Sequence, residues 1–308
     1  MEITHVGVVG CGTMGHGIAQ ISAQAGFQVV VREVSEEALT KGLGRISKSL
    51  QRLLATGRLS GDDDPETIEA RITPTLAYSD MARCDLVIEA VPEDLPTKLG
   101  VWRALDEVLD RGAVCATNTS SLSVIDQAMA TSRPERFIGL HFFNPPHVMT
   151  LLEVVRTVAT NREALQVGVD YGIRLGKDLV HTPDRAGFIV NRLLVPYTMD
   201  AVRALENGHG SMLDIDTAMR AGAGHPMGPF TLLDFVGLDV VLAITEAMFT
   251  EYREPRFAAP PTIRKLVAAG YLGRKSQRGF YDYSTGEPVP ADLALGAPQL
   301  TAVTEALR

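Results

Sequence analysis

The sequence is poor in the residues that would place it in several specialised classes of protein. It has three cysteines in 308 residues, Cys11, Cys84 and Cys115, and each lies in or beside an apolar, strand-like segment. An odd and scattered set argues against a disulfide framework and for a reducing compartment, so we expect a cytoplasmic protein. No group of cysteines and histidines has the spacing of a zinc site, and no metal is expected.

Long apolar runs and an excess of positive charge are also lacking. No apolar stretch approaches the roughly 18 residues of a membrane helix, so we expect no membrane span. The N-terminus carries Glu2 and becomes glycine-rich at once, which is not the pattern of a signal peptide. The formal net charge of -8 argues against nucleic acid as a partner.

What the sequence does contain is a glycine-rich turn near its start. An apolar strand is predicted over 6–9 and a helix of small residues over 14–25, and Gly10-x-Gly12-x-x-Gly15 joins them. A second strand ends just before Glu33, about 20 residues on, where a dinucleotide-binding fold places the acid that holds the ribose hydroxyls. An ordinary strand–turn–helix with a solvated Glu33 is the alternative, but the context favours a pyrophosphate-binding turn.

Strand and helix patterns alternate as far as residue 184. Strands are predicted at 6–9, 27–31, 71–77, 84–91, 113–116, 137–140, 151–155 and 178–182. This alternation predicts an α/β domain over 1–184 with a Rossmann-type, doubly wound, mostly parallel sheet. The pattern then becomes helical, so we expect an all-α C-terminal domain over 185–284, with one continuous helix over 228–249. A loosely held tail is expected over 285–308.

The first domain contains a helical excursion over 36–60 with a basic face. Four cations recur at helical spacing opposite an apolar stripe: Lys41, Arg45, Lys48 and Arg52. One interpretation is the solvated face of an ordinary amphipathic helix. The other is a patch for an anionic substrate tail, such as a nucleotide phosphate.

Polar residues gather where later strands of this domain end. The strand over 113–116 stops in Thr117-Asn-Thr-Ser-Ser121, and His141 follows the strand over 137–140. Such residues suit either a ligand crevice at the carboxyl ends of parallel strands or the N-cap of the next helix. Glu153 lies inside an apolar strand, which is costly without a partner, and His141 is the candidate. A histidine oriented by a carboxylate is a suitable general base.

The sequence resembles the L-3-hydroxyacyl-CoA dehydrogenase family, in particular the bacterial 3-hydroxybutyryl-CoA dehydrogenases. The resemblance covers nearly all of residues 3–284. Its main stretches are Val8-Val-Gly-Cys-Gly-Thr-Met-Gly-His-Gly-Ile-Ala19, Asp85-Leu-Val-Ile-Glu-Ala90, Asn118-Thr-Ser-Ser-Leu122, Gly139-Leu-His-Phe-Phe-Asn-Pro145, Gly187-Phe-Ile-Val-Asn-Arg-Leu193, Asp214-Ile-Asp-Thr-Ala-Met219, His225-Pro-Met-Gly-Pro229, Gly273-Arg-Lys-Ser276 and Gly279-Phe-Tyr281.

The resemblance implies a reaction and a catalytic set. The enzyme would oxidise an L-3-hydroxyacyl-CoA to the 3-ketoacyl-CoA with NAD, and run in reverse. His141 matches the family's base, which removes the 3-hydroxyl proton as hydride leaves C3, and Glu153 matches its carboxylate partner. Ser120 and Asn191 match the residues that bind the substrate oxygen. The resemblance also implies a homodimer formed largely through the helical domain.

Further positions match residues that bind NAD or CoA in the family. The matches on the cofactor side are Gly10, Gly12, Thr13, Met14, Gly15, Glu33, Glu93, Lys98, Ser120, Asn144 and Lys275. Ser49 matches a CoA contact. The family's second CoA contact is a lysine, but Thr56 stands here, so Arg52 or Arg58 is expected to replace it. Glu33 stands where the family usually has aspartate and should repel a 2′-phosphate, although Arg32 beside it could accept one.

Two other functions stay open at this point. Related two-domain dehydrogenases act on carnitine, gulonate or other free hydroxy acids and share the glycine-rich loop and a His-x-x-Asn motif. A catalytically silent protein that still binds NADH is the second alternative, and the complete Ser120, His141, Glu153 and Asn191 set argues against it. The length and chemistry of the acyl chain are not specified by these residues.

Overall fold

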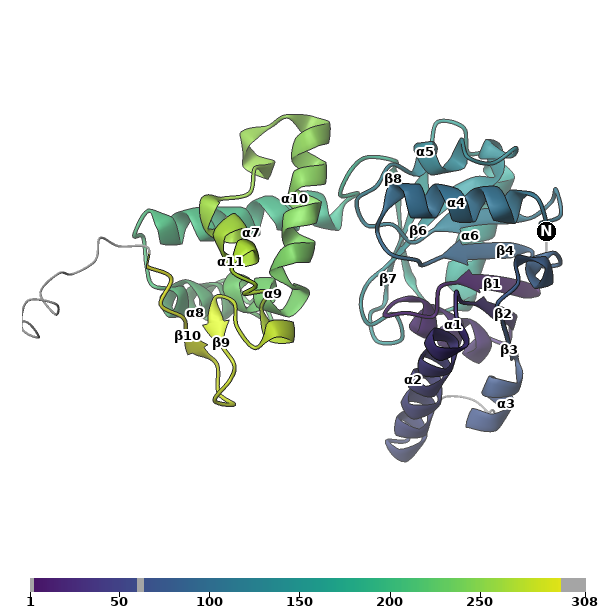
Figure 1. Ribbon diagram of the computed structural model, residues 1–308, viewed down its shortest axis with the longest axis horizontal. Coiled ribbons are helices and arrows are strands. Elements are labelled where there is room, and N and C mark those ends of the chain that lie inside the picture. The colour runs from purple at the N-terminus through teal and green to yellow at the C-terminus, as the bar shows by residue number, and fades with distance from the viewer. Residues whose placement is uncertain (1–2, 60–63, 295–308) are drawn as a thin grey trace, which may run out of the picture. The chain divides into compact units, whose positions relative to one another are not determined.

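The computed structural model describes residues 3–59 and 64–294, and the chain divides into two compact units (Figure 1). The first unit is Met1–Ile189 and the second is Val190–Arg308. Residues 185–189, which the sequence analysis assigned to the helical domain, therefore belong to the first unit. Most of the predicted tail, residues 295–308, lies outside the described residues.

The first unit is built on an eight-stranded sheet with the order β3-β2-β1-β4-β5-β6-β7-β8. The strands are β1 His5–Val9, β2 Gln28–Arg32, β3 Ile72–Thr75, β4 Leu86–Glu89, β5 Val114–Thr117, β6 Phe137–Phe142, β7 Leu151–Arg156 and β8 Asp178–Pro183. Neighbouring strands pair in parallel, except that β6 and β7 are antiparallel. The predicted Rossmann-type, mostly parallel sheet is confirmed.

Helices cover both faces of this sheet, as a doubly wound fold requires. They are α1 Gly15–Gln24, α2 Glu36–Ala55, α3 Pro65–Ala70, α4 Leu95–Asp106, α5 Val124–Ala128 and α6 Arg162–Arg174. One buried core joins the strands to α1, α2, α3 and α6, and the other joins them to α4 and α5. Successive strand residues alternate between the two cores: Val8 and Ile88 face the first, whereas Val9 and Val87 face the second.

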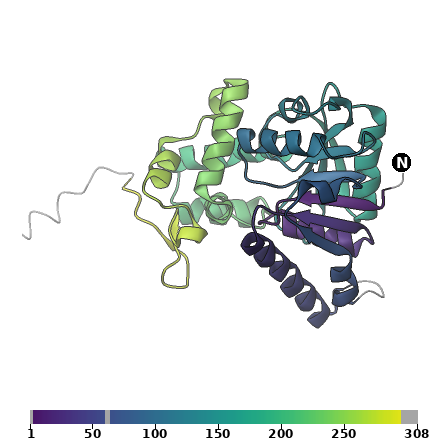
Figure 2. The same ribbon diagram turned by 45° about the vertical axis from the view of Figure 1, so that its right-hand side comes forward.

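Helix α2 carries the predicted apolar and basic faces. Its apolar residues Leu39, Ile46 and Leu50 are buried in the first core. A Cβ atom on Gly42 would lie 2.3 Å from Cys11 Sγ, so only glycine allows α2 to pack this closely on the turn after β1. In both views α2 extends away from the sheet, which leaves its basic face open to solvent (Figure 2).

Helix α3 was missed by the sequence analysis, which predicted no helix between the excursion over 36–60 and the strand over 71–77. The Asp64 side chain accepts a hydrogen bond of 2.7 Å from Thr67 N–H, and Pro65 occupies the first helical position. An N-cap aspartate followed by proline is a helix-start signal. The helix is short, so its apolar periodicity was too brief to detect.

The second unit is mainly helical. Its helices are α7 Val190–Glu206, α8 Met212–Gly222, α9 Pro229–Val236, α10 Leu238–Tyr252 and α11 Pro261–Ala268. The predicted continuous helix over 228–249 is wrong, because Gly237 has φ +100° and separates α9 from α10. Two short strands, β9 Tyr281–Asp282 and β10 Val289–Pro290, also pair antiparallel, so the unit is not purely helical.

Two buried aspartates organise the motifs of the second unit. Asp216 accepts hydrogen bonds from the backbone N–H of Phe230 and Thr231, at 2.8 and 3.0 Å, and thereby caps the start of α9. Its Oδ2 also accepts from Tyr281 O–H at 3.0 Å. Asp234 in turn accepts from the N–H groups of Phe280 and Tyr281. These contacts tie α8, α9 and the 273–283 segment together.

We expect Asp216→Asn to destabilise the protein by about 2–4 kcal/mol, because an amide NH2 would face donors that now meet a carboxylate oxygen. Chemical denaturation measures the change. Asp214→Asn is the matched control, since Asp214 is exposed on the same helix and mainly pairs with the Ser211 hydroxyl. An equal loss in both variants would contradict a specific role for Asp216.

Candidate active site

The glycine-rich turn between β1 and α1 has room on its open side. A Cβ atom on Gly10, which has φ +94°, would lie 2.7 Å from Ala90 O, and one on Gly15 would clash with Gly10 O. The fold itself therefore demands glycine at these two positions. A Cβ on Gly12 would meet nothing within 4 Å, so the space beside the turn is open at Gly12. A side chain there would occupy that open space and would not clash with the protein.

The start of α1 faces the same turn without a side-chain cap. Met14 occupies the N-cap position and makes no capping hydrogen bond, and the first turn holds no acidic residue. Free amide N–H groups and the helix dipole favour an anion there. Together with the open space at Gly12, this arrangement fits the pyrophosphate of NAD. Thr13 is exposed and Met14 half-buried at this end.

Glu33 lies against this turn. Its Oε1 accepts a 2.7 Å hydrogen bond from Cys11 N–H, and its Oε2 accepts from Val34 N–H at 2.9 Å. Burial, reinforced by the Glu33 charge, raises the pKa of the Cys11 thiol to about 12, so Cys11 is not a reactive thiolate. The neighbouring Arg32 stacks on the Tyr78 ring, with 4.1 Å between the guanidinium carbon and the ring centroid.

We expect the enzyme to use NADH in preference to NADPH, because the Glu33 carboxylate would repel a 2′-phosphate while Arg32 is engaged by Tyr78. In Glu33→Ser, the ratio of kcat/KM for NADH to that for NADPH should fall by about tenfold or more. Glu66→Ser, an exposed substitution in α3, is the control for a change in net charge alone. A wild-type preference for NADPH would contradict this account of Glu33.

His141 and Glu153 face each other across the antiparallel pair of strands. They are register partners on β6 and β7, and His141 Nδ1 lies 2.6 Å from Glu153 Oε2. Both are buried, with 6 % and 0 % exposure. A neutral imidazole that donates from Nδ1 to this carboxylate leaves Nε2 with its lone pair. The predicted contact between the two residues is confirmed.

The segment after β8 supports this pair in a way that the sequence analysis missed. Ile189 N–H donates to Glu153 Oε1 at 3.0 Å. The Phe188 ring lies 5.4 Å from the His141 ring, centroid to centroid, and Phe143 packs at 4.6 Å. Phe188 has φ +45°, a strained conformation for a bulky residue that typically costs about 1–3 kcal/mol. This strained backbone places the Phe188 ring against His141 and the Ile189 N–H against Glu153.

The polar loop after β5 is held by Glu93. Its Oε1 accepts hydrogen bonds from Thr119 O–H at 2.5 Å and from Ser120 N–H at 2.9 Å. Lys98 lies 3.2 Å from the other Glu93 oxygen. Asn118 Oδ1 accepts from Phe142 N–H at 2.9 Å, which joins this loop to the residue after His141. The structure thus brings Ser120, Glu93 and Lys98 into one hydrogen-bonded network within the first unit.

The other predicted site residues are not part of the hydrogen-bonded networks around His141 and Glu93 described above. Asn144 is exposed in the loop after β6, and Ser49 and Arg52 lie on the half-buried and exposed sides of α2. Thr56 donates its hydroxyl hydrogen to carbonyls at the end of α2. Asn191, in the first turn of α7, and Lys275, which pairs with Asp239 at 2.6 Å, belong to the second unit. Their assigned roles stay predictions.

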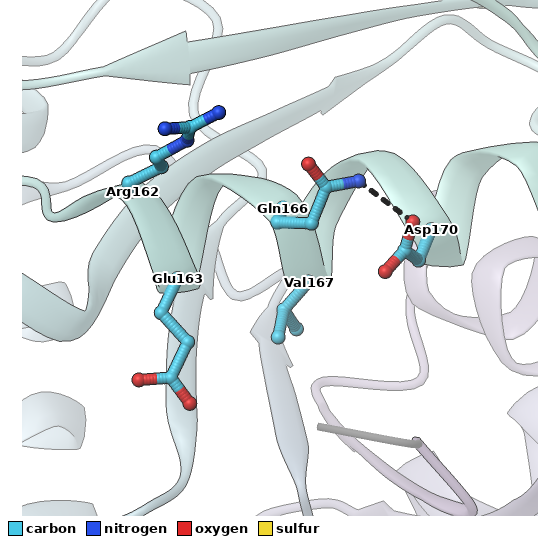
Figure 3. A pocket seen from close by; sticks show the side chains of 5 residues that line it. All are labelled: Arg162, Glu163, Gln166, Val167 and Asp170. Carbon is cyan, nitrogen blue, oxygen red and sulfur yellow. Dashed lines mark hydrogen bonds between the residues drawn. The ribbon is translucent and has the colours of Figure 1, made fainter.

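A surface hollow of about 400 Å³ lies along α6 (Figure 3). It is lined by Arg162, Glu163, Gln166, Val167 and Asp170, and Gln166 Nε2 donates to Asp170 at 2.8 Å. It contains no predicted site residue. Within residues 3–59 and 64–294 no helix is long and apolar enough to cross a membrane. The same residues hold no group of three or more His, Cys, Asp or Glu side chains suited to a metal ion.

Comparisons with known proteins give family matches over both units. The model of the 3-hydroxyacyl-CoA dehydrogenase NAD-binding domain matches residues 5–185, and that of the C-terminal domain matches 187–283. A 3-hydroxybutyryl-CoA dehydrogenase from Mycobacterium tuberculosis is 45 % identical over 283 residues, covering 91 % of this chain and 99 % of the relative. The mitochondrial hydroxyacyl-coenzyme A dehydrogenase of Sus scrofa is 44 % identical, covering 91 % of both chains.

Among solved structures, (S)-3-hydroxybutyryl-CoA dehydrogenase from Ralstonia eutropha is 40 % identical with a TM-score of 0.89, covering 92 % of this chain and all of that one. The matches span both units, and the glycine-rich turn fits the NAD that the N-terminal domain of these proteins binds. The chain therefore belongs to the 3-hydroxyacyl-CoA dehydrogenase family and is an NAD-dependent oxidoreductase acting on CH–OH groups.

Proposed function

We propose that the protein interconverts an L-3-hydroxyacyl-CoA and the corresponding 3-ketoacyl-CoA. The observation that carries the proposal is the buried contact of 2.6 Å between His141 Nδ1 and Glu153 Oε2. It leaves His141 Nε2 as a base for the 3-hydroxyl proton. When bound, NAD supplies the acceptor for the hydride that leaves C3.

In this mechanism each predicted catalytic residue has a distinct task. His141 removes the proton in oxidation and returns it in reduction. Glu153 holds the imidazole tautomer and balances the positive charge that develops on the ring. Ser120 binds the substrate oxygen, with Asn191 as the second predicted partner. The buried position of His141, which is 6 % exposed and in contact with two phenylalanine rings, limits competing proton exchange with water.

A CoA thioester is supported by the basic face of α2. The side chains of Lys41, Arg45, Lys48 and Arg52 are all exposed on this helix. Such a face attracts the phosphates of CoA, whereas a free hydroxy acid would not need it. The relatives named above act, by their names, on hydroxyacyl-CoA or 3-hydroxybutyryl-CoA. This support distinguishes the proposal from the carnitine and gulonate alternatives.

The test is NADH oxidation with acetoacetyl-CoA compared with free acetoacetate at equal concentration. We expect turnover with the thioester and a kcat/KM at least about 100-fold lower with the free acid, because the phosphate contacts are lost. Equal rates, or a preference for the free acid, would contradict the proposal. Tight NADH binding without turnover of acyl-CoAs of any chain length would instead indicate a catalytically silent relative.

We further propose a cytoplasmic homodimer formed through the second unit. Large apolar side chains are exposed there, including Leu193, Phe235 and Val240 at 67, 47 and 42 %. Exposed apolar patches commonly mark interfaces. The three cysteines are free and buried, which suits a reducing compartment. Sedimentation at micromolar concentration should give the mass of a dimer, and a monomer would contradict this part of the proposal.

A further inference from the structure

A buried ion pair lies next to the polar loop that follows β5. Glu89, the last residue of β4, is fully buried, and its Oε1 accepts hydrogen bonds from Lys98 Nζ at 2.7 Å and Val91 N–H at 2.8 Å. Lys98 is itself only 1 % exposed. Burying two charges is expensive, and apolar residues of similar size would often be at least as stable. The pair therefore invites an explanation beyond stability.

Lys98 is shared between two carboxylates. Its Nζ lies 3.2 Å from Glu93 Oε2 as well as 2.7 Å from Glu89. The other oxygen, Glu93 Oε1, accepts from Ser120 N–H at 2.9 Å and Ser121 N–H at 3.2 Å. Burial alone would raise the pKa of Glu93, but the Lys98 charge and the hydrogen bonds from Thr119 and Ser120 outweigh it and hold that pKa below its usual value. Glu93 is therefore ionised and anchors the loop at neutral pH.

The second oxygen of Glu89 reaches the same loop by another route. Thr117, the last residue of β5, donates its hydroxyl hydrogen to Glu89 Oε2 at 2.8 Å. The next residue, Asn118, accepts from Phe142 N–H at 2.9 Å, and Phe142 directly follows His141. Glu89 is thus connected to the loop that carries Ser120 through Lys98 and Glu93 on one side and through Thr117 on the other.

We propose that Glu89 is a positioning residue for the dehydrogenase reaction, which sets the place of the Ser120 hydroxyl relative to His141 through Lys98, Glu93 and Thr117. The inference rests on the proposed function, in which Ser120 binds the substrate oxygen. If glutamine replaced Glu89, Lys98 would have one anionic partner, Glu93, instead of two. Its ammonium would be drawn toward Glu93, and Glu93 Oε1 would move from the Ser120 and Ser121 amides.

A double-mutant cycle between Glu89→Gln and Ser120→Ala tests the proposal. We expect Glu89→Gln alone to lower kcat with acetoacetyl-CoA on the order of 10- to 100-fold, and less than about threefold in the Ser120→Ala background. The kcat is measured at saturating NADH, because Glu93, Lys98 and Ser120 are also predicted cofactor contacts and the variants can weaken NADH binding. A residue that only stabilises the fold would give independent, multiplicative effects on kcat. Multiplicative effects on kcat overturn the proposal.

Matched variants keep the test decisive. Asp106→Asn breaks another partly buried ion pair of the same unit, with Arg133 at 3.0 Å, and should show no coupling to Ser120→Ala. If Glu89→Gln does not fold, Thr117→Val replaces it in the cycle, because it removes one donor to Glu89 with little change of shape. Wild-type protein without acyl-CoA turnover, or an unimpaired Ser120→Ala, would refute the proposed function. An active wild type and an impaired Ser120→Ala without coupling would refute only the role of Glu89.

Discussion

Replacing His141 by glutamine is expected to lower kcat for reduction of acetoacetyl-CoA by about two to four orders of magnitude. Glutamine has a similar size, and its amide can still donate a hydrogen bond to Glu153 in place of His141 Nδ1. It cannot, however, exchange a proton with the substrate oxygen near pH 7. The loss should fall on kcat, because the residue acts on the reacting bond rather than on the cofactor.

The control measurements separate a catalytic loss from a structural one. The dissociation constant of NADH should stay within about threefold of the wild type, since the glycine-rich turn follows β1 and Glu33 follows β2, whereas His141 lies on β6. His181→Gln makes the same chemical change at an exposed position on β8 of the same sheet and should leave kcat unchanged. A parallel weakening of NADH binding, or an equal loss in the control, would argue against His141 as the base.

The fold was predictable where a residue pattern is local. Alternating strands and helices identified the sheet, and the apolar stripe identified α2 with its buried Leu39, Ile46 and Leu50. The errors occur where a single residue determines whether a helix continues or ends. Gly237 divides one apolar run into two helices because it takes φ +100°, and glycine inside a run does not by itself indicate a break. β9 and β10 are too short to have a periodicity of their own.

The site was predictable where burial conflicts with charge. Glu153 stood out as an acid inside an apolar strand, and the structure pairs it with His141. The same rule could have identified Glu89, which ends another apolar strand and is paired with Lys98. Phe188 and Ile189 could not be found in this way. Their contacts with His141 and Glu153 depend on where the chain runs after β8, which no local pattern encodes.

Glu153 is the residue whose isosteric replacement should reveal how the histidine is oriented. Its two oxygens face different donors: Oε2 meets His141 Nδ1, and Oε1 meets Ile189 N–H at 3.0 Å. In Glu153→Gln the amide oxygen would have to face Ile189 N–H, because an NH2 group there would oppose another donor. The amide NH2 would then point at His141 Nδ1. That atom would become an acceptor, and the ring hydrogen would move to Nε2.

We therefore expect Glu153→Gln to lower kcat by about two to four orders of magnitude, because the base would be held in the wrong tautomer and the positive charge that develops on it would lose its partner. Glu153→Asp keeps the negative charge but places the carboxylate farther from His141. It should therefore retain more activity than the glutamine variant. Both effects act through one histidine, so the double variant with His141→Gln should be no more than about threefold slower than His141→Gln alone. Fully multiplicative losses of kcat would show instead that Glu153 acts independently of His141, through its buried position at the centre of β7.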